Sequence, residues 1–87
     1  MEFDLSFTDK ALKDLDNLDK TTAKRLLKKL IWITKQNNPL SLATKLTDTS
    51  IGDVRFRIGD YRAIGIVNYK SKKIIVVAIG NRRDVYR

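Results

Sequence analysis

The sequence predicts an α+β fold in which two N-terminal helices pack on a mainly antiparallel four-stranded sheet. Apolar residues recur at helical spacing between residues 9 and 36, whereas three later segments are rich in β-branched residues and are separated by short turns. A shorter alternating segment precedes the helices. The predicted element order is therefore β-α-α-β-β-β. With 87 residues, 43% of them hydrophobic, and no linker or repeat, the chain is expected to form one domain over residues 1–87.

The N-terminal half supplies the first strand and both helices. Phe3, Leu5 and Phe7 alternate with polar residues, which predicts a strand. Thr8 or Asp9 is suited to cap the helix that follows, and Asp19 or Thr21 to begin the second helix. The helix stripes consist of Ala11, Leu12, Leu15 and Leu18, then Ala23, Leu26, Leu27, Leu30, Ile31 and Ile33. The second helix should end near Gln36, before Asn37-Asn38-Pro39, and residues 40–52 should be irregular.

The C-terminal half predicts three strands, at about 53–58, 61–68 and 73–80. Gly59-Asp60 is a suitable two-residue hairpin loop between the first two. Gly65 interrupts a β-rich segment, which indicates a bulge or a close approach of another backbone. Residues 74–79 are apolar without alternation, which is typical of a central strand covered on both faces.

The hairpin carries the most informative charges of the chain. With a two-residue loop, Ile58 faces Tyr61 and Arg57 faces Arg62, so that Arg55, Arg57 and Arg62 share one face. Like charges directly opposite each other destabilise a sheet pair. The cluster therefore indicates a polyanionic partner; the alternative is three solvated arginines on an outer face.

Composition narrows the chemistry. The chain has no histidine and no cysteine, which excludes a histidine-based nuclease, a thiolate nucleophile and a zinc hydrolase with such ligands. No metal or other cofactor is expected. The start of the sequence does not resemble a signal peptide and no segment is as long as a membrane span, so a cytoplasmic location without membrane contact is expected.

The formal net charge of +8 points to an acidic partner. Residues 51–87 hold nine basic and three acidic residues, and six of the nine are arginines, whose planar fork suits phosphate. The second helix carries basic residues on its polar side, where either a solvated face or RNA contact would explain them: Lys24, Arg25, Lys28, Lys29 and Lys35. Trp32 projects from that side and either covers a loop or belongs to a partner-binding surface.

Two motifs together, Arg55-Phe56-Arg57-Ile58-Gly59-Asp60-Tyr61-Arg62 and Gly80-Asn81-Arg82-Arg83-Asp84-Val85-Tyr86-Arg87, resemble the RelE/ParE superfamily of toxins from toxin–antitoxin pairs. The resemblance extends over essentially the whole chain and includes the element order. In the RelE branch it implies cleavage of messenger RNA in the ribosomal A site by attack of the 2′-hydroxyl on the adjacent phosphate. ParE-like members instead inhibit DNA gyrase and are not known as nucleases.

The resemblance also implies roles for individual residues. By motif position, Arg57, Arg62, Arg82 and Tyr86 would be catalytic, and Arg55 matches a basic position of the same strand. Arg83, Arg87 and Lys45 are further candidates for RNA contact, Lys45 because it is the lysine nearest to the hairpin on its N-terminal side. Asn81 departs from the histidine of many relatives, and Gly65 from a common aromatic residue. Arginine does not deprotonate in proteins, so the arginines are expected to orient and stabilise the phosphate rather than act as a base.

Our first hypothesis is accordingly a ribosome-dependent mRNA endonuclease toxin whose partners are an acidic antitoxin, the ribosome and mRNA. The second is a ParE-like gyrase inhibitor without nuclease activity. The third is a nucleic-acid-binding module without toxicity.

Overall fold

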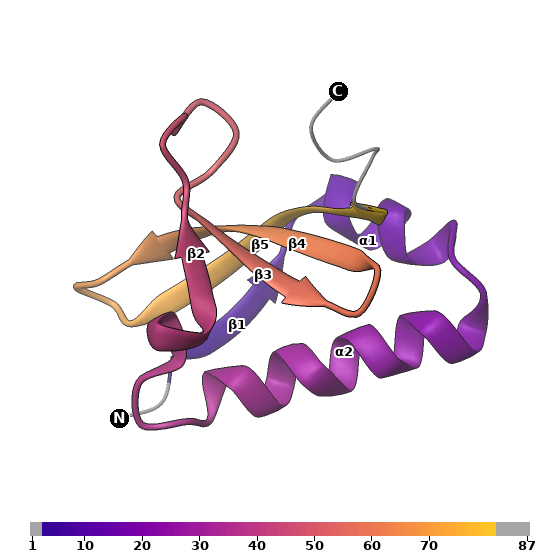
Figure 1. Cartoon of the computed structure of the whole chain (residues 1–87), viewed down its shortest axis with the longest axis horizontal. Coiled ribbons are helices and arrows are strands. Elements are labelled where there is room, and N and C mark those ends of the chain that lie inside the picture. The colour runs from indigo at the N-terminus through magenta and orange to yellow at the C-terminus, as the bar shows by residue number, and fades with distance from the viewer. Residues whose placement is uncertain (1–2, 82–87) are drawn as a thin grey trace.

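The computed structural model describes residues 3–81, in which two helices pack on a five-stranded sheet with the strand order β1-β5-β4-β3-β2 (Figure 1). In chain order the elements are β1 (Asp4–Phe7), α1 (Asp9–Asp16), α2 (Lys20–Thr34), the 3-10 helix η1 (Pro39–Leu42), β2 (Ala43–Lys45), β3 (Val54–Ile58), β4 (Tyr61–Asn68) and β5 (Lys73–Asn81). β1 runs parallel to β5, and all other neighbours are antiparallel. The α+β class and the mainly antiparallel sheet predicted from the sequence are confirmed.

The prediction of four strands was wrong by one. Within the segment 40–52, which was expected to be irregular, Ala43–Lys45 form the edge strand β2, with Ala43 opposite Phe56 and Lys45 opposite Val54. Three residues are too few to show an alternating pattern, and the pairing depends on β3, which lies about ten residues further along the chain. Such short edge strands limit unwanted pairing with other chains.

Side-chain caps fix where the helices begin. The Thr8 hydroxyl accepts the Ala11 N–H at 3.2 Å, and the Asp19 carboxylate accepts the Thr22 N–H at 3.1 Å. Of the two candidates predicted for each helix, Thr8 is therefore the N-cap of α1 and Asp19 is the N-cap of α2. α2 ends at Thr34, two residues before the predicted end, and Gln36 continues only as a final tight turn through its N–H bond to the Ile33 carbonyl.

The core lies between the helices and one face of the sheet. α1 and α2 contribute Ala11, Leu26, Leu30 and Ile33, and the strands contribute Val54, Phe56, Ala63, Val67, Ile74, Val76 and Ile79. The apolar stripes of the helices are wider than the surface they bury, because Leu12, Leu27 and Ile31 remain 37–47% exposed.

β5 is an inner strand, as predicted, but its burial alternates. Ile74 and Val76 are fully buried under the helices, whereas Ile75 and Val77 on the other face are only half-buried. The expectation of cover on both faces was therefore wrong for the described residues. Because residues on both faces of β5 are apolar, the strand leaves apolar side chains on the face of the sheet opposite to the helices.

Neither helix in residues 3–81 is both long and apolar enough to cross a membrane.

Candidate functional site

The hairpin of β3 and β4 has the predicted register. Ile58 pairs with Tyr61 and Arg57 with Arg62, around a loop of Gly59 and Asp60. Gly59 has φ of +60°, a conformation in which glycine avoids the steric cost that a side chain would add. The loop thus fixes the register, and the register fixes which side chains share a face.

Arg55, Arg57 and Arg62 lie on the face of the sheet opposite to the helices, as predicted, because their alternate neighbours Phe56 and Ala63 belong to the core. Their exposure differs. Arg57 is exposed and Arg55 half-buried, but Arg62 is only 8% exposed. We call these three residues the arginine face.

The burial of Arg62 follows from its neighbours. Arg62 is opposite Gly80 of β5, and glycine has no side chain to occupy the space beside the arginine. The next residue of β4 on the same face, Ile64, is fully buried. The Nε atoms of Arg55 and Arg62 are both inaccessible to solvent. Packing of this kind restricts the side-chain rotamers, so that less conformational entropy remains to be lost when an anion binds.

Lys45 does not join the arginine face. It pairs with Val54, whereas Thr44 pairs with Arg55, so the register places Thr44 rather than Lys45 on the face of the arginines. The proposed contact of Lys45 with RNA stays a prediction, from a position at the sheet edge. Thr44 is a polar neighbour that sequence reasoning missed, because the strand that orients it was missed.

The remaining predicted residues, Arg82, Arg83, Tyr86 and Arg87, lie outside the described residues. The last residues of β5 nevertheless lie beside the hairpin, with Asn81 opposite Tyr61 and Gly80 opposite Arg62. The start of the C-terminal motif is thus held beside the hairpin.

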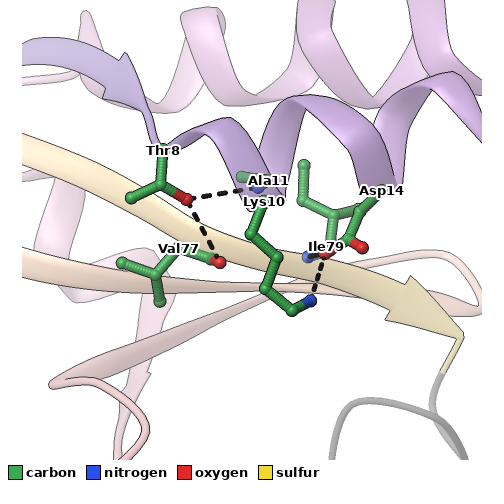
Figure 2. A network of polar contacts seen from close by, with 6 residues as sticks. All are labelled: Thr8, Lys10, Ala11, Asp14, Val77 and Ile79. Carbon is green, nitrogen blue, oxygen red and sulfur yellow. Dashed lines mark hydrogen bonds and ion pairs between the residues drawn. The ribbon is translucent and has the colours of Figure 1, made fainter.

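Side chains at α1 hold this end of β5 through hydrogen bonds to its backbone (Figure 2). The Asp14 carboxylate accepts the Ile79 N–H at 2.9 Å and pairs with the Lys10 ammonium at 2.8 Å. The Thr8 hydroxyl donates to the Val77 carbonyl at 3.4 Å. Sequence reasoning missed Asp14; the spacing to Lys10 is visible in the sequence, but the bond to a backbone group 65 residues away is not.

A second anchor holds the loop before β3 against β4. The Asp53 N–H donates to the Gly65 carbonyl at 2.9 Å, and the Asp53 carboxylate accepts the Val67 N–H at 2.9 Å. The pairing of β4 with β5 shifts register between Ile64 and Gly65, so the irregularity predicted at Gly65 is present, with Val77 as the extra residue in the neighbouring strand β5. Gly52 approaches the same point so closely that a Cβ there would lie 2.5 Å from Ile64 Cγ2.

These groups define the chemistry available to residues 3–81. No cluster of three or more potential metal-ligating side chains occurs in this part of the chain. The arginine face offers planar, permanently charged hydrogen-bond donors, which suit the bidentate binding of phosphate. It can orient an anion and stabilise added negative charge, but guanidinium groups do not accept protons.

Comparisons with known proteins agree with this architecture. The family model of the ParE toxin of the type II toxin–antitoxin system parDE matches residues 5–86. The chain resembles the crystal structure of the toxin–antitoxin complex RelBE2 from Mycobacterium tuberculosis, with a TM-score of 0.84, 19% identity, and coverage of 97% of this chain and 95% of that one. It also resembles the archaeal RelE–RelB complex from Pyrococcus horikoshii OT3, with a TM-score of 0.74, 28% identity, and coverage of 97% and 99%. A free mutant of the Escherichia coli toxin RelE gives a TM-score of 0.76 at 23% identity, with coverage of 99% and 92%. No curated protein matches the sequence.

Proposed function

We propose that this chain, which belongs to the ParE toxin family of type II toxin–antitoxin systems, acts as a ribosome-dependent mRNA endonuclease that inhibits translation. The RelE/ParE superfamily contains both nucleases and gyrase inhibitors, so the choice depends on the site rather than on the fold. The observation that carries the proposal is the arginine face, with Arg57 directly opposite Arg62.

The arrangement suits phosphodiester cleavage. In the proposed reaction the 2′-oxygen of the RNA loses its proton and forms a bond to the adjacent phosphorus, while the bond from phosphorus to the 5′-oxygen breaks. The 5′-oxygen takes up a proton, so the products are a 2′,3′-cyclic phosphate and a 5′-hydroxyl. Negative charge grows on the phosphate oxygens, and Arg57 and Arg62 would stabilise it. Arg55 would hold the neighbouring backbone. The C-terminal motif would add Arg82 as a further donor and Tyr86 as a stacking or proton-transferring group, with Arg83 and Arg87 in contact with RNA.

The proposal includes partners. The relatives from M. tuberculosis and P. horikoshii were crystallised as toxin–antitoxin complexes. By analogy, this chain would bind a cognate antitoxin, whose acidic character is suggested by the net charge of +8. The ribosome and mRNA would be its targets, in the cytoplasm.

A ParE-like gyrase inhibitor is the second candidate, favoured by the family model that matches the chain. In that case the arginine face would bind an acidic protein surface or DNA and would carry out no chemistry.

In vitro translation with mapping of message 5′ ends separates the two. We expect new ends within ribosome-bound codons, and none on naked RNA, because the proposed site lacks an evident base and depends on the ribosome to align its substrate. Intact message together with arrested supercoiling by purified gyrase would reject the nuclease in favour of the gyrase inhibitor.

A further inference from the structure

A groove runs along α2 beside the end of the β3–β4 hairpin. It has a volume of about 500 Å³ and is lined by Arg25, Lys28, Lys29, Trp32 and Ile58. A smaller hollow of about 120 Å³ shares Arg25 and Ile58 and extends along the helix towards its N-terminus. The four helical residues have the spacing i, i+3, i+4 and i+7, so they form one stripe.

The cations of this stripe are costly to the free protein. Arg25 and Lys29 are i, i+4 neighbours of like charge, an arrangement that destabilises a helix. The ion pair that the structure shows within residues 3–81 joins Lys10 and Asp14 on α1, and none involves these side chains. Arg25, Lys28 and Lys29 are all exposed. An anion in the groove would relieve the repulsion.

Trp32 gives the groove a second kind of contact. Its side chain is 48% exposed, and the Lys29 ammonium lies over the ring, 4.3 Å from the centroid. An indole face beside cations is the combination on which single-stranded nucleic acids bind, with bases stacked on the ring and phosphates on the charges. Ile58 would form the apolar floor beneath the base.

We propose that this groove binds a segment of single-stranded RNA, with phosphates on Arg25, Lys28 and Lys29 and one base against Trp32. Ile58 and Arg57 are adjacent in β3 and point to opposite faces of the sheet, so the groove and the arginine face are separate surfaces on the two sides of one hairpin. The inference goes beyond the proposed function, because binding here requires no cleavage. An acidic peptide would match the charge, but its carboxylates would offer the indole no aromatic ring to stack on.

Trp32 is the only tryptophan of the chain, so its fluorescence reports directly on the groove. We would titrate the full-length protein with a short oligouridylate at low salt and expect saturable quenching. Arg25→Gln/Lys28→Gln/Lys29→Gln should weaken the binding at least tenfold, and its dependence on the logarithm of salt concentration should fall by about two units of slope. Lys20→Gln/Lys24→Gln/Lys70→Gln removes the same charge outside the groove lining and is the matched control.

The stacking contact is tested by replacing the ring. Binding is then followed by fluorescence anisotropy of the labelled oligouridylate, in an Arg55→Ala/Arg57→Ala background that suppresses the arginine face. Trp32→Leu should weaken binding about tenfold, and Trp32→Phe should retain most of it.

Equal affinities of the two triple variants, or no quenching of Trp32, would overturn the RNA site. Equal quenching by poly-L-glutamate at the same charge concentration would assign the groove to an acidic peptide instead. Quenching that survives in a protein without nuclease activity would leave this site standing and reject only the proposed function.

Discussion

At the scale of single residues, the three arginines of the hairpin differ more in environment than in chemistry. Arg57 is exposed, and its side chain is free to reach a ligand, whereas Arg62 is 8% exposed and packs as part of the sheet surface. Removing Arg62 relieves its repulsion with Arg57 but also deletes buried side-chain volume. Because burial is nearly complete, we expect the loss of packing to dominate.

The two arginines should therefore separate activity from stability. Arg57→Ala should lower the cleavage rate about 10²-fold with an unchanged melting temperature. Arg62→Ala should lower the rate at least as much and also reduce the free energy of unfolding by about 1–2 kcal/mol. Growth arrest on induction, translation assays and thermal melts are the measurements, with Lys70→Ala as an exposed control. Full toxicity of both folded variants would reject the proposed role of the arginine face.

The N-cap of α2 should make the free energy of unfolding depend slightly on pH in the acidic range. The Thr22 hydroxyl donates to the Asp19 carboxylate at 2.5 Å, and with the Thr22 N–H it lowers the pKa of Asp19 below its ordinary value of 3.8. A lowered folded pKa means that the contribution is complete above about pH 4 and is lost as the pH falls through the folded pKa.

Asp19→Asn retains the cap without the charge, so the stability of this variant should lack the acid-dependent component. Asp19→Ala should be less stable than the wild type and Asp19→Asn at neutral pH. Urea unfolding between pH 2 and 7 measures the difference. Parallel pH curves for wild type and Asp19→Asn would show that the carboxylate charge contributes nothing.

At the scale of elements, what could be predicted was local. The structure confirms the caps at Thr8 and Asp19 and the hairpin register around Gly59, and each of these depends on a few neighbouring residues. β2 and the bond from Asp14 to Ile79 depend on segments brought together only by folding, and no local pattern encodes them.

In the candidate site, too, the features set by neighbouring residues could be predicted, whereas those set by distant segments could not. The alternation of β3 placed Arg55, Arg57 and Arg62 on one face, but burial of Arg62 depends on Gly80 in another strand. The contact of Lys45 with RNA stays a prediction, and its position at the sheet edge depends on β2, which no local pattern indicates. The sequence shows Trp32 beside basic residues, but the groove in which Trp32 lies also needs Ile58, which is 26 residues away along the chain.

Gly52 is the element-scale test of how the loop before β3 is held. A Cβ at this position would lie 2.5 Å from Ile64 Cγ2 and 3.1 Å from the Gly65 carbonyl oxygen. Ile64 is 1% exposed, so a shift of its side chain would disturb the packing around it. Gly52→Ala should therefore destabilise the fold by about 1–3 kcal/mol, as overpacking generally does.

Chemical denaturation measures this cost, and the hairpin loop supplies the control. Gly59 has a φ of +60°, but nothing lies within 4 Å of a Cβ there, and asparagine tolerates this conformation. Gly59→Asn should consequently change stability much less than Gly52→Ala. Equal effects would mean that the close approach at Gly52 does not limit the packing of the loop.

At the scale of the whole molecule, charge is the dominant property. The formal net charge of +8 is concentrated in the C-terminal half, where the arginine face lies, and α2 adds a separate basic stripe without any acidic residue. These two surfaces on opposite sides of the sheet give a small protein a positive field over much of its surface. A binding partner that neutralises the protein should be strongly acidic, and it should be attracted before contact is made.

This attraction predicts how the antitoxin binds. We expect the product of an adjacent gene to bind the protein and to restore growth, with an association rate that falls at least tenfold as salt rises from about 0.05 to 0.5 M. The dissociation rate should change less, because it is governed by contacts already formed. Stopped-flow mixing measures both rates, and Lys20→Gln/Lys24→Gln/Lys70→Gln should slow association without much effect on dissociation. An association rate that is insensitive to salt would show that apolar surface, such as exposed Leu27 and Ile31 on α2, rather than charge, drives the encounter.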